Sequence, residues 1–374
     1  MVQRAWASDI RAPIDRVTTA LTRLRDDAAS LTDVDWEMLL GADGPHLEEL
    51  CVLADAARAR VTDPDALTFV VNRNLDTAVV SPPTAGQPTV EALVAEAHEL
   101  GATEICLQGP VPADAPADDY LRLIDRIHTT APDIHLHAFR PPEIRDAAHR
   151  MGIGIDEFLR RARTAGLGSV PGTAAQILDD EVRAPLAPTG TAPPVDEWIT
   201  TIEAAHAAGL FSTATMLYGH IETPAQQIAH LRLLLDIQRR TGGFSELILM
   251  PLLPENTPAH LPRPAASASR RETRALHAVA RLLTLGAIDH LQVAWTKLDP
   301  DTVDLLLRGG ADDIGGVLLD GRLMPAAGPE AGRVLDPETL AAIAFRAGRV
   351  PVQRTTGYGV PAPDRLLPIP QVQR

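Results

Sequence analysis

Hydrophobic and polar positions follow two different patterns along the 374-residue chain. Residues 1–66 place apolar side chains at helical spacing, most clearly in "LTDVDWEMLL" (31–40) and "HLEELCVLADAARARV" (46–61). A cap at Thr32 or Asp33 precedes the first of these runs. The pattern predicts an N-terminal helical segment.

From residue 67 onward, short apolar runs alternate with longer runs of helical spacing, several of which end on glycine. The eight predicted strands are 67–73, 104–108, 134–139, 168–172, 211–217, 246–252, 290–295 and 313–319. Strands that alternate with helices indicate a parallel sheet, and eight units favour a closed barrel over an open doubly wound sheet. The expected fold class is α/β, a (βα) barrel of the TIM type with an N-terminal helical extension. The expected domains are a helical segment 1–66, a barrel 67–350 and a Pro-rich, extended or mobile tail 351–374.

Composition and charge exclude several kinds of partner. A hydrophobic content of 45% suits a sizeable core, and a formal net charge of −15 argues against binding to nucleic acid. No apolar run approaches the roughly 20 residues that span a bilayer. The opening "MVQRAWASDIRAPIDR" carries charges where a signal peptide needs apolar residues. We therefore expect a cytoplasmic protein with neither a nucleic-acid nor a membrane partner.

The C-terminal ends of the predicted strands are polar, and in parallel barrels these ends carry the working groups. The first strand ends in Asn72, Arg73 and Asn74, and the second ends in Gln108. The other polar positions near strand ends are His135, His137, Thr173, Gln176, Thr215, Tyr218, His220, Glu255, Asn256, Lys297, Asp312 and Asp313. This set predicts a site for a small molecule, although loops of a purely structural barrel are polar as well.

Three local patterns allow further interpretations. His135 and His137 alternate on one side of their strand and could bind zinc together with His220 and Asp312, as in a metal-dependent hydrolase. Thr173 and Gln176 have the spacing of a helix capping box. The chain's two cysteines, Cys51 and Cys106, cannot supply the three or four thiolates of an ordinary iron–sulfur site.

Several longer segments together resemble one known family. They are "VVNRN", "HAFRPPEI", "PGTAAQILDDEVR", "TATMLYGHIETP", "HLRLLLDIQRRTGGFSE", "AVARLL", "GGADDIGGVLL" and "QRTTGYG". In this order they resemble the tyrosine-transferring half of FO synthase, an enzyme of deazaflavin cofactor biosynthesis. The resemblance implies a radical S-adenosylmethionine barrel with a 4Fe–4S cluster. Such an enzyme joins a tyrosine-derived hydroxybenzyl group to ribitylaminouracil.

The chain departs from the family pattern at three positions around the cofactors. The family places three cysteines just after the segment that matches "VNRN", but here the loop reads "LDTAVVSPPTAGQP". A Gly-Gly turn of the family is replaced by Gly109-Pro110, and Gln176 stands where the family usually has glutamate. These departures predict that the 4Fe–4S cluster is absent. They leave open whether S-adenosylmethionine binds, with Gln176 as the candidate cofactor-side residue.

The resemblance also implies substrate-side residues that the chain retains. These are His137, Thr215, Tyr218, His220, Asp312 and Asp313. We expect a non-radical paralogue or pseudoenzyme that binds a uracil- or tyrosine-like molecule, with an intact FO synthase paralogue as a candidate partner. The alternatives are an active FO-synthase-type transferase and a metal-dependent hydrolase that uses His135 and His137. Whether the protein is an enzyme stays open at this point.

Overall fold

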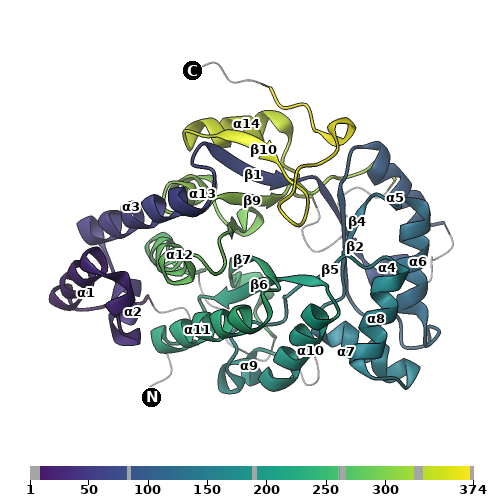
Figure 1. Ribbon diagram of the computed structural model, residues 1–374, viewed down its shortest axis with the longest axis horizontal. Helices are drawn as coiled ribbons and strands as arrows, with labels where there is room; N and C mark the ends of the chain where they lie inside the picture. The colour runs from purple at the N-terminus through teal and green to yellow at the C-terminus, as the bar shows by residue number, and fades with distance from the viewer. Residues whose placement is uncertain are drawn as a thin grey trace. The chain divides into compact units, whose positions relative to one another are not determined.

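The structure is a computed structural model that describes residues 9–81, 86–187, 192–259, 261, 267–323 and 332–370 (Figure 1). Parts of three predictions therefore lie outside the described residues: the start of the opening segment (1–8), the middle of the loop after Asn74 (82–85) and the end of the tail (371–374). The strands are β1 (Ala66–Val70), β2 (Asn72–Asp76), β3 (Glu104–Gln108), β4 (His135–Ala138), β5 (Ser169–Val170), β6 (Phe211–Tyr218), β7 (Phe244–Pro251), β8 (Leu291–Val293), β9 (Asp313–Gly316) and β10 (Val350–Gln353).

The strand arrangement confirms the predicted fold class. All eight predicted strands are present, the first of them divided into β1 and β2 at Val71, and β10 is an additional strand that was not predicted. Their hydrogen-bonded order is β10-β1-β9-β8-β7-β6-β5-β4-β3-β2. The pairs from β2 to β6 and from β7 to β9 are parallel. From β3 to β9 this order follows the chain, as expected for a parallel α/β barrel.

The helices begin and end at the signals that the sequence offers. They are α1 (Ile14–Asp26), α2 (Asp33–Leu40), α3 (Gly44–Val61), α4 (Thr77–Val80), α5 (Val90–Glu99), α6 (Asp119–Thr130), α7 (Pro141–Met151), α8 (Ile155–Ala165), α9 (Asp180–Leu186), α10 (Val195–Ala207), α11 (Pro224–Thr241), α12 (Arg270–Thr284), α13 (Pro300–Leu307) and α14 (Pro337–Arg346). Thr32 caps α2 in a capping box with Asp35. Gly166 and Gly242 end α8 and α11 in the left-handed conformation.

The predicted capping box at Thr173 and Gln176 is wrong. Residues 173–178 form a turn followed by bends, and the next helix, α9, begins at Asp180 with Asp179 as its cap. Ala174 and Gln176 adopt φ values of 71° and 51°, which interrupt a right-handed helix. The left-handed backbone therefore overrides the capping signal of the sequence.

The chain divides into two compact units. Unit 1 comprises Met1–Ala66, Ala175–Val195 and Ala214–Ile314, and unit 2 comprises Leu67–Ala174, Asp196–Thr213 and Gly315–Arg374. The predicted barrel 67–350 is thus shared between both units, and the predicted helical segment 1–66 groups with part of it. In unit 1, α12 packs against α3, α2 and α11 (Figure 1).

In unit 2, helices cover one face of the strands. Helix α6 packs against β4 and against its neighbours α5 and α8 (Figure 1). The strand residues Leu75, Ile105, Leu107, Leu136, Ala138 and Val170 are all buried and apolar. They alternate with polar residues along their strands, as a half-buried parallel sheet requires. The helices and this apolar layer make the core of unit 2.

The Pro-rich tail contains a turn at residues 356–358 and the short helix η4 (Pro363–Arg365), is otherwise extended, and is held by hydrogen bonds. Arg365 donates to the carbonyl oxygen of His98 and to the Asp133 carboxylate, each at 2.7 Å. Leu367 donates its backbone N–H to Gln353 Oε1 at 2.6 Å. The tail as far as residue 370 is therefore fastened to unit 2.

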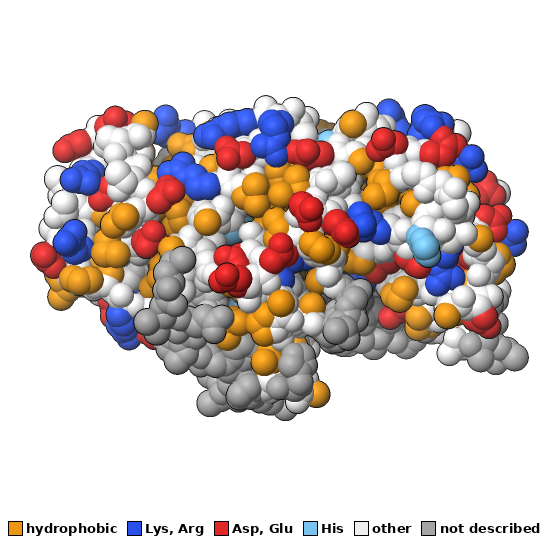
Figure 2. Space-filling view, turned by 90° about the horizontal axis from the view of Figure 1, so that it is seen from below, with side chains coloured by type: hydrophobic (Ala, Val, Ile, Leu, Met, Phe, Trp, Pro, Cys, Tyr) orange, Lys and Arg blue, Asp and Glu red, His pale blue; other side chains and the backbone are white. Residues whose placement is uncertain are grey.

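The described surface carries charges of both signs. On the face drawn in Figure 2, Lys and Arg side chains are interspersed with Asp and Glu. Among the described residues, no helix combines the length and the apolar character needed to cross a bilayer.

Candidate functional site

The face of β2 to β5 opposite the helices is polar, and this face is our candidate site. The parallel register aligns Asn72 with Glu104, and Glu104 with His135. Two residues further along these strands, toward their C-terminal ends, a second row consists of Asn74, Cys106, His137 and Ser169. A closed core would place bulky apolar side chains here. A continuous polar row instead suits a ligand that needs hydrogen bonds. We call these two rows the polar face.

Two histidines and a serine form a hydrogen-bonded group on the polar face. Ser169 Oγ lies 2.7 Å from His135 Nε2 and 2.6 Å from His137 Nδ1. Ser169 is fully buried, whereas His137 keeps 8% of its surface exposed and His135 is half-buried. No described residue contacts Nε2 of His137 at hydrogen-bonding distance, so this nitrogen can bind a ligand.

Both histidines are neutral near pH 7. Burial lowers the pKa of His135 to about 4. Burial also lowers the pKa of His137 to about 3, and the nearby His135 and Arg354 add to the effect. Neutral imidazoles can each donate one hydrogen bond and accept one, so the pair has no fixed direction of donation.

Polar groups from the segment 353–358 lie against the same strands. Thr356 donates a 2.7 Å hydrogen bond to Glu104 Oε2. The guanidinium of Arg354 is buried and stacks on the ring of Tyr358, with 3.9 Å between its central carbon and the ring centroid. Arg354 therefore brings a positive charge to the neighbourhood of His137.

The segment directly after β2 is held by its own hydrogen bonds. Asp76 caps the short helix α4 by accepting from the backbone N–H of Ala78 at 2.9 Å. Thr77 donates to the carbonyl oxygen of Gln108 at 3.0 Å, and Ser81 donates to the carboxylate of Asp119. Gly109 adopts φ 104°, and a side chain there would meet Asp76 at 3.1 Å. The start of the predicted cluster loop is thus an ordered helical turn.

Other predicted residues of unit 2 have partners within the fold. Asn72 Oδ1 accepts from the Leu318 N–H at 3.0 Å, and Asn72 Nδ2 donates to Asn74 Oδ1 at 3.2 Å. Arg73 points to the helix side, where its guanidinium binds Glu96 at 3.0 Å. Gln108 donates to Cys106 Sγ at 3.1 Å. Their roles in binding a ligand remain predictions.

Thr173 is the exception in unit 2. Its hydroxyl oxygen is buried and has no hydrogen-bonding partner among the described residues. A buried hydroxyl without a partner costs stability, roughly 1–3 kcal/mol. An unpaired group of this kind can instead bind a ligand.

In unit 1, the predicted residues at the end of β6 are enclosed by protein. Tyr218 is fully buried, donates to Thr273 Oγ1 at 3.1 Å and has its pKa raised by burial. The carbonyl oxygen of Thr215 lies 2.9 Å from His230 Nε2, and His230 Nδ1 accepts from the N–H of Leu178 at 2.9 Å. His230 thereby ties the loop 171–178 to β6.

His220 is also built into the turn that follows β6. Its Nε2 lies 2.9 Å from the carbonyl oxygen of Leu217, and its Nδ1 lies 3.0 Å from Glu222 Oε2. The Glu222 carboxylate accepts the backbone N–H groups of Gly219 and His220 at 2.7 and 2.8 Å. Glu222 thus stabilises the turn, whereas His220 Nδ1 lies near Glu222 but makes no hydrogen bond to a described residue.

Asp312 lies in a buried charge network of unit 1. Its carboxylate accepts from Arg281, from His290 Nδ1 at 2.7 Å and from the Leu291 N–H at 2.7 Å. Burial alone would raise the pKa of Asp312, but the His290 hydrogen bond and the Arg281 charge hold it below its ordinary value. The neighbouring Asp313 is buried at the first position of β9, opposite Gln292. Both aspartates precede or begin their strand, away from its C-terminal end.

The four residues of the zinc interpretation do not form one group. His135 and His137 belong to unit 2, whereas His220 and Asp312 belong to unit 1 and have the partners given above. Within the described ranges, no three or more His, Cys, Asp or Glu side chains are arranged to hold a metal ion.

Gln176 also belongs to unit 1. Its side-chain Oε1 is buried and lacks a hydrogen-bonding partner in the part of the chain that the structure describes. Its backbone oxygen accepts from the Leu217 N–H at 2.9 Å. Its role on the cofactor side remains a prediction.

The sequence did not single out Ser169, Glu104 or Arg354. Ser169 lies in a strand of two residues, and its partners are 34 and 32 residues away along the chain. Only the parallel register brings these residues together. The one available signal was their position, because Ser169 falls at the same step of its strand as His137.

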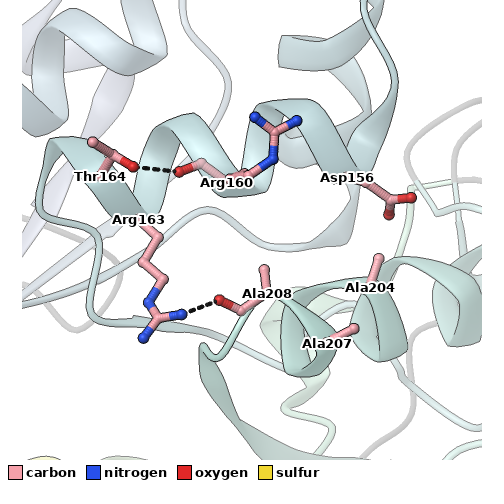
Figure 3. A pocket seen from close by; sticks show the side chains of 7 residues that line it. All are labelled: Asp156, Arg160, Arg163, Thr164, Ala204, Ala207 and Ala208. Carbon is pink, nitrogen blue, oxygen red and sulfur yellow. Dashed lines mark hydrogen bonds between the residues drawn. The ribbon is translucent and has the colours of Figure 1, made fainter.

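A separate hollow of about 590 Å³ lies on the outer surface of unit 2, between α8 and α10 (Figure 3). Three alanines of α10 and its end form one wall. Arg163 donates to the carbonyl oxygen of Ala208 at 2.6 Å, and Arg160 pairs with Glu157. These internal contacts engage both of its arginines, so the polar face is the better candidate.

Comparison with known proteins supports the resemblance to FO synthase that the sequence segments indicate. No family model matches the chain. The FO synthase of Mycobacterium leprae is 40% identical over 365 residues, which cover 92% of this chain and 42% of that protein. The FO synthase of Mycobacterium tuberculosis is 39% identical over 372 residues, with 43% of that protein covered. The chain thus spans about two fifths of the length of these relatives.

A shorter archaeal protein matches along most of its own length. The 5-amino-6-(D-ribitylamino)uracil–L-tyrosine 4-hydroxyphenyl transferase of Archaeoglobus fulgidus is 36% identical over 321 residues, which cover 92% of that protein. Two solved structures share the fold: the hydrogenase maturase HydG of Carboxydothermus hydrogenoformans and methylornithine synthase PylB. Each has a TM-score of 0.63, at 15% and 16% sequence identity, and the match covers 81% and 97% of the respective chain. The chain therefore belongs to the family of FO synthase and the archaeal 5-amino-6-(D-ribitylamino)uracil–L-tyrosine 4-hydroxyphenyl transferase.

Proposed function

We propose that the protein binds a uracil- or tyrosine-like small molecule on the polar face and does so without a 4Fe–4S cluster of its own. The observation that carries this proposal is the open Nε2 of His137 beside the amide and carboxyl groups of the same face. Imidazole and amide groups both donate and accept hydrogen bonds, as the N–H and C=O groups of a uracil ring require. The names of the relatives, ribitylaminouracil and tyrosine transferases, support this class of ligand.

The residues present do not fit a cluster held by three thiolates. Such clusters are ligated by cysteine, and the chain has two cysteines. Cys51 lies on α3 in unit 1, where burial raises the pKa of its thiol. Cys106 lies within β3 and receives the hydrogen bond of Gln108. The proposal therefore assigns no step to a cluster and describes a non-radical member of the family.

A second candidate is an active transferase whose cluster is ligated from outside this chain. The identity of 36% to the archaeal transferase favours it. Anaerobic reconstitution with iron and sulfide separates the two candidates. The first predicts no stoichiometric cluster and no reductive cleavage of S-adenosylmethionine. A stoichiometric cluster that cleaves S-adenosylmethionine would establish the second.

Calorimetric titration with 5-amino-6-(D-ribitylamino)uracil, and separately with L-tyrosine, tests the binding itself. We expect saturable binding of at least one of them and an affinity at least about tenfold lower in His137→Ala, which removes one hydrogen bond to the ligand. Ser212→Ala is the control, because Ser212 is a buried serine of unit 2 that pairs with His206 at 2.7 Å. If neither compound binds, or His137→Ala binds equally well, the proposal is wrong.

A further inference from the structure

Ser169 connects His135 and His137 through a single hydroxyl proton. Its Oγ lies within hydrogen-bonding distance of His135 Nε2 and His137 Nδ1, at 2.7 and 2.6 Å, and no other side chain of the described residues bonds to it. The hydroxyl can donate to one ring only and must then accept from the other.

This constraint links the tautomers of the two rings. If Ser169 donates to His137 Nδ1, His137 carries its proton on Nε2 and His135 donates from Nε2. If Ser169 donates to His135 Nε2, His135 carries its proton on Nδ1 and His137 donates from Nδ1. In both arrangements the two neutral rings are the same tautomer. A mixed pair would leave the buried hydroxyl or a ring nitrogen unpaired, at a cost of about 1–3 kcal/mol.

We propose that His137, Ser169 and His135 form a proton relay between the polar face and the far side of His135. A ligand donates a proton to His137 Nε2, and the Nδ1 proton of His137 moves to Ser169 Oγ. The hydroxyl proton moves to His135 Nε2, and the Nδ1 proton of His135 leaves to water. One proton enters and one leaves, so no net charge accumulates and no oxidant or reductant is needed. The reverse sequence delivers a proton to the ligand.

The surroundings of His135 allow this ring to release the proton and hold it in position. Nδ1 of His135 has no hydrogen-bonding partner among the described residues, and the side chain is half-buried, so a proton can leave there. Gly168 makes room for the ring, because a Cβ at that position would lie 2.4 Å from His135 Cε1. The ring also lies against Phe211, with 5.4 Å between the centroids, which restricts its rotation.

The relay is present in the ligand-free protein, so its test is separate from that of the proposed function. Protein labelled with ¹⁵N-histidine is examined by long-range ¹H–¹⁵N NMR at pH 7, where the ring nitrogen shifts report the tautomer. We expect equal tautomer fractions for His135 and His137. In Ser169→Ala the two fractions become independent, whereas in the control Ser212→Ala they stay equal. Opposite tautomers in the unaltered protein, or unchanged fractions in a folded Ser169→Ala, would overturn the relay.

A second measurement examines proton movement. Saturation with 5-amino-6-(D-ribitylamino)uracil is expected to change the tautomer of both rings together and, in Ser169→Ala, of His137 alone. A change confined to His137 in the unaltered protein would contradict the relay. Failure of this compound to bind would count against the proposed function, while the ligand-free tautomers still decide the relay.

Discussion

His137 in unit 2 and His230 in unit 1 differ in the groups that their ring nitrogens contact. In unit 2, His137 uses Nδ1 to contact Ser169, and its Nε2 has no partner within the described residues. In unit 1, His230 has hydrogen-bonding partners at both nitrogens, and its side chain is almost fully enclosed. The presence of a histidine therefore does not by itself indicate a ligand-binding site. A ring nitrogen without a protein partner is a better indication.

Asp312 and Thr173 show the same contrast between a polar group with partners and one without. Asp312 in unit 1 accepts from a cation, an imidazole and a backbone N–H. Thr173 in unit 2 has a buried hydroxyl without a described partner. Polar groups of the first kind stabilise the fold, and those of the second kind cost stability. Substitutions that measure stability can therefore separate structural residues from candidate binding residues.

The largest loss of folding stability is expected for Asp312→Asn. The change removes the negative charge beside the fully buried Arg281, and an uncompensated buried charge costs about 3–5 kcal/mol. Denaturant unfolding measures the loss. Asp301→Asn is the control, because the Asp301 side chain is 82% exposed and should change stability by less than about 0.5 kcal/mol. Equal effects of the two substitutions would contradict the assigned role of Asp312.

The next largest effect is expected for His230→Ala. This substitution leaves the Leu178 N–H and the Thr215 carbonyl oxygen without their partner in a buried region. Two such losses should lower the free energy of unfolding by about 2–4 kcal/mol. His230→Gln, which can donate and accept, should recover part of it. A loss below about 1 kcal/mol in His230→Ala would mean that the ring does not fasten the loop 171–178.

Acid should destabilise the protein through its buried histidines. Burial lowers the pKa of His135, His206, His230 and His277 to about 4 and that of His137 to about 3. Since the unfolded chain binds protons near pH 6.5 and the native rings do not, stability is complete above pH 6.5 and declines as the pH falls toward 4. Each histidine contributes a slope of about 1.4 kcal/mol per pH unit. Unfolding at pH 7.5, 6 and 5 measures it. His230→Gln should reduce the slope by one such contribution, and an unchanged slope would contradict this.

The smallest expected change in stability is an increase, and it is expected for Thr173→Val. Thr173→Val removes a buried hydroxyl that has no described partner, so it should raise the free energy of unfolding by about 1 kcal/mol. Thr201→Val is the matched control, because the Thr201 hydroxyl donates to the Glu197 carbonyl oxygen at 2.8 Å and its loss should not stabilise. Destabilisation by Thr173→Val would show that the hydroxyl has a partner in the folded protein.

Much of the fold could be predicted from the sequence, because each strand is a short apolar run followed by a helix of clear periodicity. The strand β10 was missed because Pro351 interrupts it and its valines are exposed. Helix α7 begins at Pro141, where proline is well tolerated in the first turn of a helix.

The site was harder to predict than the fold. His137 was selected from its strand position, but Ser169 required the register between β4 and β5. Asp312 and His220 were selected as polar residues near strands, and the sequence gives no sign of the partners that the fold supplies, such as Arg281 and Glu222. Contacts between residues far apart in the chain decide which polar groups remain available.

The most direct test of the central contrast is NMR of the ¹⁵N-labelled histidine rings during titration with 5-amino-6-(D-ribitylamino)uracil and L-tyrosine. We predict that one of these compounds shifts the ring nitrogens of His137, and with them those of His135, while His220, His230 and His277 of unit 1 keep their shifts. Shifts confined to the unit 1 histidines, or no shift with either compound, would contradict the assignment of the ligand site to the polar face of unit 2.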